Sequence, residues 1–254
     1  MKKTVIALQL YTLREIMKTP QEIVKTLKAV RKIGYQAVQL AGLGPFSPGE
    51  YRQILDGEGL CACASHTGLD PIVKETQRVI EEQKILGVKY LVCPGLPMEL
   101  QNAAGYRKAA KSLSRAGKVF SQAGLVLGYH NHALELEKYG RKLGLEILFS
   151  ESNPKYLQAE IDTYWIAFGG GDPASWCLKF AGRLPTVHLK DMGIKKNTQV
   201  MTEVGEGNLN WKAIFSACKK AGTRWYIVEQ DICQRHPLES VKISLENLHK
   251  MGLR

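Results

Sequence analysis

The sequence has 254 residues, a formal net charge of +11 and 44% hydrophobic residues, which is the composition of a globular chain and not of a disordered one. No run approaches the roughly 18 apolar residues of a transmembrane helix, and the apolar stretch near the N-terminus is too short for a signal peptide. We therefore expect a cytoplasmic protein with no membrane partner. Lys and Arg residues are spread along helical segments, so the positive charge does not predict a nucleic-acid partner.

Short β-branched and apolar runs alternate with longer segments of helical period along the chain. The runs predict eight strands, at residues 5–10, 37–41, 60–65, 90–95, 125–130, 157–162, 186–190 and 225–230. The segments that follow them predict eight amphipathic helices, at residues 20–33, 48–57, 71–86, 102–122, 141–150, 173–182, 211–221 and 237–251. In the GGGDP segment (169–173), Asp172 and Pro173 are expected to begin a helix as N-cap and first residue.

Eight strand–helix units in a chain of this length are typical of a (β/α)8 barrel, which is an α/β fold. An open doubly wound sheet is the alternative. That fold would place a glycine-rich phosphate loop after its first strand, but QLYTLRE (9–15) contains no glycine. No linker or shift in composition divides the chain. The sequence therefore predicts a single TIM barrel domain over residues 1–254.

Polar side chains collect at the carboxyl ends of the predicted strands, where TIM barrels carry their active sites. Asp162, His188 and Glu229 end three successive strands, so their side chains can point at one centre. Buried ionisable groups need a compensating charge, and a mixed set of oxygen and nitrogen ligands suits Mn²⁺, Co²⁺, Mg²⁺ or Zn²⁺. We therefore predict one bound divalent metal ion as the cofactor.

The strand-end residues resemble the sugar phosphate isomerase/epimerase superfamily, the xylose isomerase-like TIM barrels, over essentially the whole chain. The most specific segments are QLYTLRE (9–15), SHTGLD (65–70), YHNHALELE (129–137), DTYW (162–165), GGGDP (169–173), VHLKDM (187–192), GEGNLNW (205–211) and VEQD (228–231). The family holds one divalent ion on Glu, Asp, His and Glu from strands five to eight. The resemblance therefore implies that Asp162, His188 and Glu229 are metal ligands.

The fourth ligand departs from the family pattern, because strand five ends in Y-H-N-H where many members have Glu. His130 occupies the strand-end position and is favoured as the ligand. Glu135 lies a few residues further on and could curl back to the metal instead. The sequence leaves both open.

The resemblance implies a metal-dependent sugar isomerase or epimerase of carbohydrate metabolism, which removes a proton next to a carbonyl and stabilises the enediolate on the metal. Glu229 or Glu135 would be the base, and Lys190 would neutralise developing charge. The other polar and aromatic groups of the rim are expected to bind the sugar: Gln9, Tyr11, Arg14, Gln39, His66, His132 and Trp165. The partner is then a small-molecule sugar, with homo-oligomerisation left open.

Three other functions use the same fold. A lyase or dehydratase acting on a 3-keto-glycoside or an inosose would eliminate from the same enediolate, and the sequence does not separate it from an isomerase. A DNA-repair AP endonuclease needs additional His and Asp ligands for three zinc ions, and Trp165 and Cys93 stand where histidines would be needed. A non-catalytic sugar-binding barrel is the third.

The long connection from Gly193 to Asn210 is expected to form a mobile lid.

Overall fold

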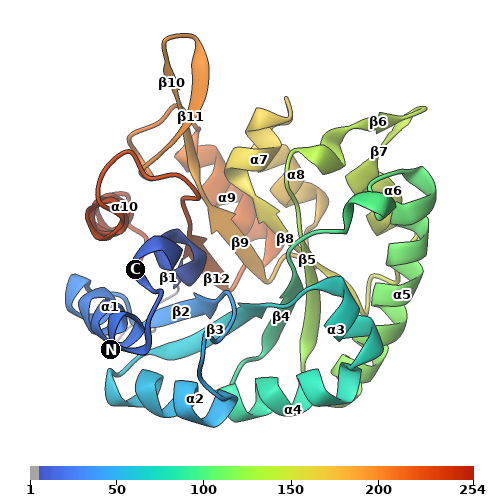
Figure 1. The fold of residues 1–254 in the computed structure, drawn as a ribbon. Coiled ribbons are helices and arrows are strands. Elements are labelled where there is room, and N and C mark those ends of the chain that lie inside the picture. Colours follow the sequence, from blue (N-terminus) through green and yellow to red (C-terminus); the bar gives the residue numbers. More distant parts are fainter. Residues whose placement is uncertain (1–5) are drawn as a thin grey trace.

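A computed structural model describes residues 6–254 and shows a closed barrel of parallel strands surrounded by helices (Figure 1). The strands run around the barrel in the order β1–β2–β3–β4–β5–β8–β9–β12, and β12 pairs with β1 to close it. Their bounds are β1 (Ile6–Gln9), β2 (Ala37–Leu40), β3 (Cys61–His66), β4 (Tyr90–Cys93), β5 (Val126–His130), β8 (Gln158–Asp162), β9 (Thr186–Leu189) and β12 (Trp225–Val228). The predicted (β/α)8 barrel is confirmed, and Val5 of the first predicted strand lies outside the described residues.

The outer layer contains α1 (Pro20–Ile33), α2 (Pro48–Gly57), α3 (Leu69–Lys74), α4 (Thr76–Leu86), α5 (Ala103–Gln122), α6 (Gly144–Ser150), α7 (Thr163–Phe168), α8 (Pro173–Lys179), α9 (Trp211–Ala221) and α10 (Pro237–Lys250). Short 3₁₀ helices lie at Leu10–Ile16, Met98–Leu100 and Leu134–Leu136. The helix predicted over 71–86 is two helices, because Glu75 leaves the helical conformation with φ −125° and ψ 33°. The helix predicted from 141 begins later, because β6 (Lys138–Tyr139) and β7 (Lys142–Leu143) form a hairpin there.

Capping residues explain where several helices begin and end. The Thr19 side chain accepts a hydrogen bond from the Glu22 amide and the Glu22 carboxylate accepts one from the Thr19 amide, which fixes the start of α1. Asp172 caps α8 by accepting from the Ser175 amide, and Pro173 is its first residue, as predicted. Gly222 ends α9 with φ 82°, a left-handed conformation that glycine adopts without steric cost.

The barrel interior changes from apolar to polar along the strands. Small and aliphatic side chains fill its first layer: Ala7, Ala37, Cys63, Ala64 and Ile227. Because alternate residues of a strand face the same side, Gln9 and Gln39 follow Ala7 and Ala37 into the interior one layer higher. The strand register then sets Gln9 beside Gln39, His130 beside Glu160, and Asp162 beside His188. Polar groups are thereby concentrated at the carboxyl ends of the strands.

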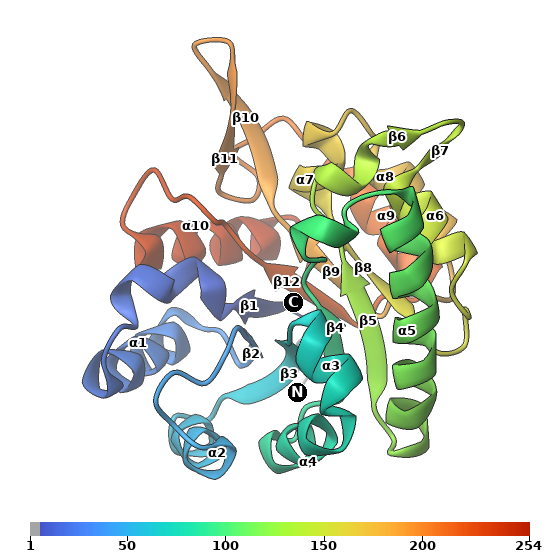
Figure 2. The ribbon, with the colours of Figure 1, turned by 45° about the vertical axis from the view of Figure 1, so that its right-hand side comes forward.

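A second hairpin projects from the same end of the barrel, where the sequence predicted only a long connection. It consists of β10 (Asp191–Lys195) and β11 (Thr198–Thr202), which pair in antiparallel fashion, and it stands clear of the barrel in two views (Figures 1 and 2). Its tip carries Lys196 and Asn197 with φ of 49° and 61°, both in the left-handed region that Asn tolerates better than most residues. The expected lid is therefore an ordered β-ribbon over its first half.

The second half of that connection is fastened to the barrel by Asp191. The Asp191 carboxylate is fully buried and accepts hydrogen bonds from five N–H groups: those of Met192, Gly205, Gly207 and Leu209 and the indole of Trp211, at 2.7 to 3.3 Å. One negative charge thus satisfies the donors of a loop that would otherwise bury them without partners. This half of the predicted lid is held in place.

Amide hydrogen exchange is expected to separate the two halves of the connection. The amides of Gly205 and Gly207 bond to the buried carboxylate and should exchange slowly, whereas the exposed tip residues Lys196 and Asn197 should exchange fast. The measurement is mass-spectrometric or NMR exchange on the ligand-free protein. Equal, rapid exchange over both halves would contradict the fastening role of Asp191 and restore the single mobile lid.

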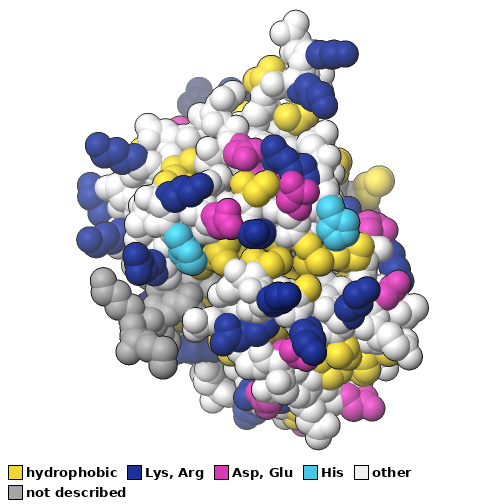
Figure 3. All heavy atoms as spheres, turned by 90° about the vertical axis from the view of Figure 1, so that its left-hand side faces the viewer, with side chains coloured by type: hydrophobic (Ala, Val, Ile, Leu, Met, Phe, Trp, Pro, Cys, Tyr) yellow, Lys and Arg dark blue, Asp and Glu magenta, His cyan; other side chains and the backbone are white. Residues whose placement is uncertain are grey.

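The charged residues are dispersed over the surface. Figure 3 shows Lys and Arg side chains on one face among acidic and apolar ones, with basic side chains also on the projecting hairpin. Over residues 6–254, we find no helix with both the length and the hydrophobicity needed to cross a bilayer.

Candidate active site

A cavity of about 560 Å³ opens at the carboxyl ends of the strands. Its walls combine aromatic, histidine and carboxylate side chains with small residues: Tyr11, Ala41, Gly42, His66, Pro94, His130, His132, Trp165, Glu229 and Asp231. Another hollow, of about 420 Å³, lies at the opposite end of the barrel, and the described residues that line it include no His, Asp or Glu. Groups capable of acid–base or metal chemistry are therefore gathered at the first cavity.

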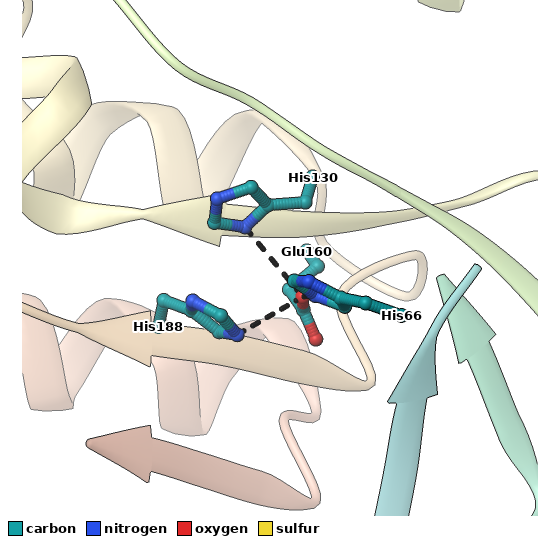
Figure 4. A group of neighbouring side chains, drawn as sticks. All are labelled: His66, His130, Glu160 and His188. Atoms are coloured by element: carbon teal, nitrogen blue, oxygen red, sulfur yellow. Dashed lines mark hydrogen bonds and ion pairs between the residues drawn. The ribbon is translucent and has the colours of Figure 1, made fainter. Parts of the chain in front are cut away.

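Three histidines converge on Glu160 (Figure 4). The Glu160 Oε1 atom lies 2.7 Å from His66 Nε2, 3.1 Å from His188 Nε2 and 3.5 Å from His130 Nδ1. The four side chains come from β3, β5, β8 and β9. We call these residues (His66, His130, Glu160 and His188) the histidine-rich set.

A supporting row of amides lies beneath Glu160. Gln39 donates from Nε2 to Glu160 Oε2 at 2.9 Å, and Gln9 donates from Nε2 to Gln39 Oε1 at 2.9 Å. All three side chains are completely buried. Gln9 and Gln39, predicted to bind the sugar, lie below the cavity and not in its walls, and this placement favours a role in holding Glu160.

Lys190 is the centre of a second cluster. Its ammonium lies 3.0 Å from Asp162 Oδ2, 2.8 Å from Glu229 Oε2 and 2.7 Å from Asp231 Oδ2. Burial alone would lower the pKa of Lys190, but the three carboxylates outweigh it and hold this pKa above its ordinary value. Burial would likewise raise the pKa of Glu229, yet Lys190 and His188 keep it well below the usual range. For Asp162 burial dominates and raises the pKa to about 6.

His130 and His188 connect the two clusters. His188 directs Nε2 at Glu160 and Nδ1 at Glu229, the latter at 2.8 Å. His130 directs Nδ1 at Glu160 and Nε2 at Asp162, the latter at 3.9 Å. With Asp162 and Glu229 they form a second group of potential ligands, the carboxylate-rich set (His130, Asp162, His188 and Glu229), which is the set predicted from the sequence.

Both sets fit a metal ion by the chemistry of their donors. In each, four atoms from histidines and carboxylates lie within 4.8 Å of one another, and every residue except His66 is buried. His130 Nδ1 is a buried atom that forms no hydrogen bond. Such an atom is costly unless a ligand or an ion completes it.

Glu135, the alternative strand-five ligand and base, lies outside both sets. It is buried and accepts hydrogen bonds from the Tyr129 hydroxyl at 2.7 Å and from the His132 amide at 2.8 Å. Burial raises its pKa to about 7. Its contacts fix the turn that carries His132, so His130 is the strand-five member of both sets.

The remaining predicted substrate ligands lie around the cavity mouth. Tyr11, His66, His132 and Trp165 are part of its wall. Arg14 is not: its guanidinium lies 4.2 Å from the centre of the Tyr11 ring and donates to the Asp231 carbonyl at 2.8 Å. Arg14 therefore braces two parts of the rim.

The sequence analysis missed Glu160 and Asp231. Glu160 stands two residues before Asp162 on the same strand, and the two-residue alternation that directs Asp162 inward directs Glu160 inward as well. That signal was available. Asp231 lies beyond the end of β12, and nothing in its local sequence indicates a contact with Lys190.

Comparison with known proteins identifies the family of this chain. The sequence pattern of the xylose isomerase-like TIM barrel matches residues 27–251. An inosose dehydratase of Geobacillus kaustophilus is 23% identical, over 89% of this chain and 86% of its own. A sugar phosphate isomerase/epimerase structure from Parabacteroides distasonis is 24% identical with a TM-score of 0.81, covering 96% of this chain and 92% of that one. The IOLI protein, solved with a bound zinc atom, is 14% identical with a TM-score of 0.74, covering 97% of both chains. The chain belongs to the xylose isomerase-like TIM barrel family.

Proposed function

We propose that this protein is a divalent-metal-dependent enzyme that moves a proton next to the carbonyl group of a sugar or a related keto-polyol, as an isomerase or epimerase. The observation that carries the proposal is the buried cluster of histidines and carboxylates that reaches a 560 Å³ cavity at the carboxyl end of the barrel. The structural neighbour from P. distasonis, a sugar phosphate isomerase/epimerase, and the zinc atom in the IOLI protein support it.

A divalent ion at this site would act as a Lewis acid, polarising the substrate carbonyl and acidifying the neighbouring C–H bond. Glu229 is the base in our proposal, because it lines the cavity, is 5% exposed and is held ionised by Lys190 and His188. The carboxylate takes the proton from carbon and returns it to the adjacent carbon for isomerisation. For epimerisation the proton taken by Glu229 stays on its carboxylate, and a second proton must reach the opposite face of the enediolate. His132, which also lines the cavity, would donate that proton from its ring N–H.

Two aromatic residues would orient the sugar. Tyr11 and Trp165 are both in the cavity wall, where a ring can stack on the apolar face of a sugar. The Trp165 indole nitrogen is buried without a hydrogen-bond partner, so a substrate oxygen in the cavity could accept from it. Lys190 lies 5.5 Å from the Trp165 ring centre, which keeps its positive charge beside the reacting atoms.

A lyase acting on an inosose or a 3-keto-glycoside is the second candidate, favoured by the similarity to an inosose dehydratase over most of both chains. Removal of the same proton by Glu229 would here be followed by cleavage of the C–O bond at the next carbon. The leaving oxygen would take up a proton and depart as water from an inosose, or as an alcohol from a 3-keto-glycoside. Incubation with an inosose separates the candidates, because a dehydratase yields an unsaturated ketone, whereas an isomerase or epimerase yields an isomer of unchanged mass.

Metal removal is expected to abolish turnover. Proton abstraction can be followed by NMR as deuterium uptake from D₂O at the carbon next to the carbonyl, with a panel of ketoses and inososes as substrates. After exhaustive chelation, deuterium uptake should fall to background and return when a divalent ion is added back. Unchanged uptake in protein shown by elemental analysis to contain no bound ion would refute the metal requirement.

A further inference from the structure

We infer that the metal ion of this protein binds to the histidine-rich set and not to the carboxylate-rich set that the family resemblance implies. The inference rests on the proposed metal dependence and adds which residues hold the ion. It assigns Glu160 as a ligand and leaves Asp162, Lys190 and Glu229 as an acid–base group beside the ion.

The position of Lys190 disfavours the carboxylate-rich set. Its ammonium lies 3.0 Å from Asp162 Oδ2 and 2.8 Å from Glu229 Oε2, and Asp162 Oδ1 is already engaged with the Trp165 amide. A metal bound to these carboxylates at about 2 Å would lie next to the ammonium, in a buried site where repulsion between like charges is strong. The two negative charges are already compensated by Lys190.

Glu160, by contrast, has no described lysine or arginine beside it to compensate its negative charge. It is completely buried, and over residues 6–254 its only ion-pair partners are His66, His130 and His188. Neutral imidazoles do not compensate a buried carboxylate, so Glu160 needs a positive charge, either a bound cation or a proton on His188, which lies between Glu160 and Glu229. An ion among these four side chains supplies it, and it also gives a partner to the unbonded His130 Nδ1 atom.

His130 and His188 belong to both sets, so a metal ion can occupy only one of the two sets at a time. A neutral imidazole ligates through one nitrogen and donates a hydrogen bond through the other. His188 Nε2 lies 2.5 Å from Gln39 Oε1, and a metal ion bound to Nε2 would replace that contact. His188 Nδ1 would then donate to Glu229 Oε2, which lies 2.8 Å away, in the carboxylate–histidine–metal arrangement that orients metal-binding histidines. Glu229 then supports the ion through His188 while remaining free to take a proton.

The donor atoms indicate the class of metal. Three imidazole nitrogens and one carboxylate suit Zn²⁺, Co²⁺ or another ion that prefers nitrogen, whereas Mg²⁺ prefers oxygen. His66 and His130 lie in the cavity wall, so the ion would be reached by substrate from their side. Glu160 precedes Asp162 by two residues on β8, so its backbone lies about 7 Å deeper in the barrel than that of Asp162.

Paired variants test the assignment, because each set has residues that the other lacks. His66→Asn and Glu160→Gln each remove a ligand of the histidine-rich set, and Asp162→Asn is the matched control in the carboxylate-rich set. Affinity for Zn²⁺ is measured by competition with a chromophoric chelator, on variants whose circular dichroism matches the parent. We expect His66→Asn and Glu160→Gln to weaken Zn²⁺ binding by ~10²-fold or more, and Asp162→Asn to weaken it by less than ~10-fold.

X-ray absorption of the Co²⁺-loaded parent protein counts the ligands without any substitution, and it should show three imidazoles. If Asp162→Asn abolishes binding while His66→Asn retains it, and two imidazoles are counted, the ion belongs to the carboxylate-rich set and the metal-dependent function still stands. If the parent protein binds neither Zn²⁺ nor Co²⁺, the inference and the proposed function both fall, and a protonated His188 must compensate Glu160. His66 is partly exposed, so His66→Asn remains informative if Glu160→Gln does not fold.

Discussion

Replacing Glu229 by Gln should lower turnover by ~10²-fold or more, the usual scale for loss of a general base, while the barrel remains folded. The Gln side chain has nearly the same shape and can still accept hydrogen bonds from His188 and Lys190, which contact Glu229 at 2.8 Å. It cannot accept a proton from carbon. Deuterium uptake at the substrate carbon should therefore fall in parallel with turnover, and both can be measured by NMR on one sample.

Glu135→Gln is the matched control for this experiment. Glu135 is a second buried carboxylate of the strand-five region, but its two oxygens accept from the Tyr129 hydroxyl and the His132 amide. In Gln the oxygen can still accept from the His132 amide, and the NH2 group can donate to the Tyr129 hydroxyl oxygen. Its effect on deuterium uptake should be much smaller than that of Glu229→Gln. The opposite order, with uptake at the parent rate in Glu229→Gln, would move the base to Glu135.

Replacing Asp191 by Ala should reduce the free energy of unfolding by roughly 3–5 kcal/mol, because five N–H groups lose a charged acceptor at once. The substitution leaves the amides of Gly205, Gly207 and Leu209 without their partner in a loop that packs on the barrel. Chemical denaturation followed by circular dichroism measures the change. Asp191→Asn, which keeps one acceptor oxygen, should cost less.

Asp172→Ala provides the comparison for Asp191. Asp172 also accepts hydrogen bonds, from the Ser175 amide and hydroxyl, but at an exposed helix start, where the loss of a cap costs about 1 kcal/mol. A similar small cost for Asp191→Ala would show that water replaces the carboxylate and that the loop is not fastened by it.

The barrel could be predicted from the sequence because each strand is a short apolar run followed by a segment of helical period. The predicted start of α8 at Asp172 and Pro173 is confirmed, and Thr19 with Glu22 is a further local signal of the same kind. The β10–β11 hairpin could not be found in this way. Its turn residues Lys196 and Asn197 are a weak turn signal beside Asn-Gly, and its strands are too exposed to show an apolar run.

The sequence predicted those site residues that lie at the ends of strands. Asp162 and His188 were found because they end their strands, and the structure brings them together. Glu160 was overlooked because it lies inside its strand and not at the end, although the alternation that directs Asp162 inward also directs Glu160 inward. The contacts of Lys190 with Asp231 depend on how β9 and β12 pair, and a single sequence does not contain that information.

The pairing of β1 with β12 also has a kinetic consequence. Leu8 and Val228 are adjacent in the barrel although they lie near opposite ends of the sequence, so closure of the ring requires the longest loop in the chain and carries the largest loss of chain entropy. Glu229 follows β12 directly, and during synthesis it leaves the ribosome after the histidines. A chain that has formed only its first seven strands lacks the proposed base. In our proposal, proton abstraction therefore requires the closed barrel.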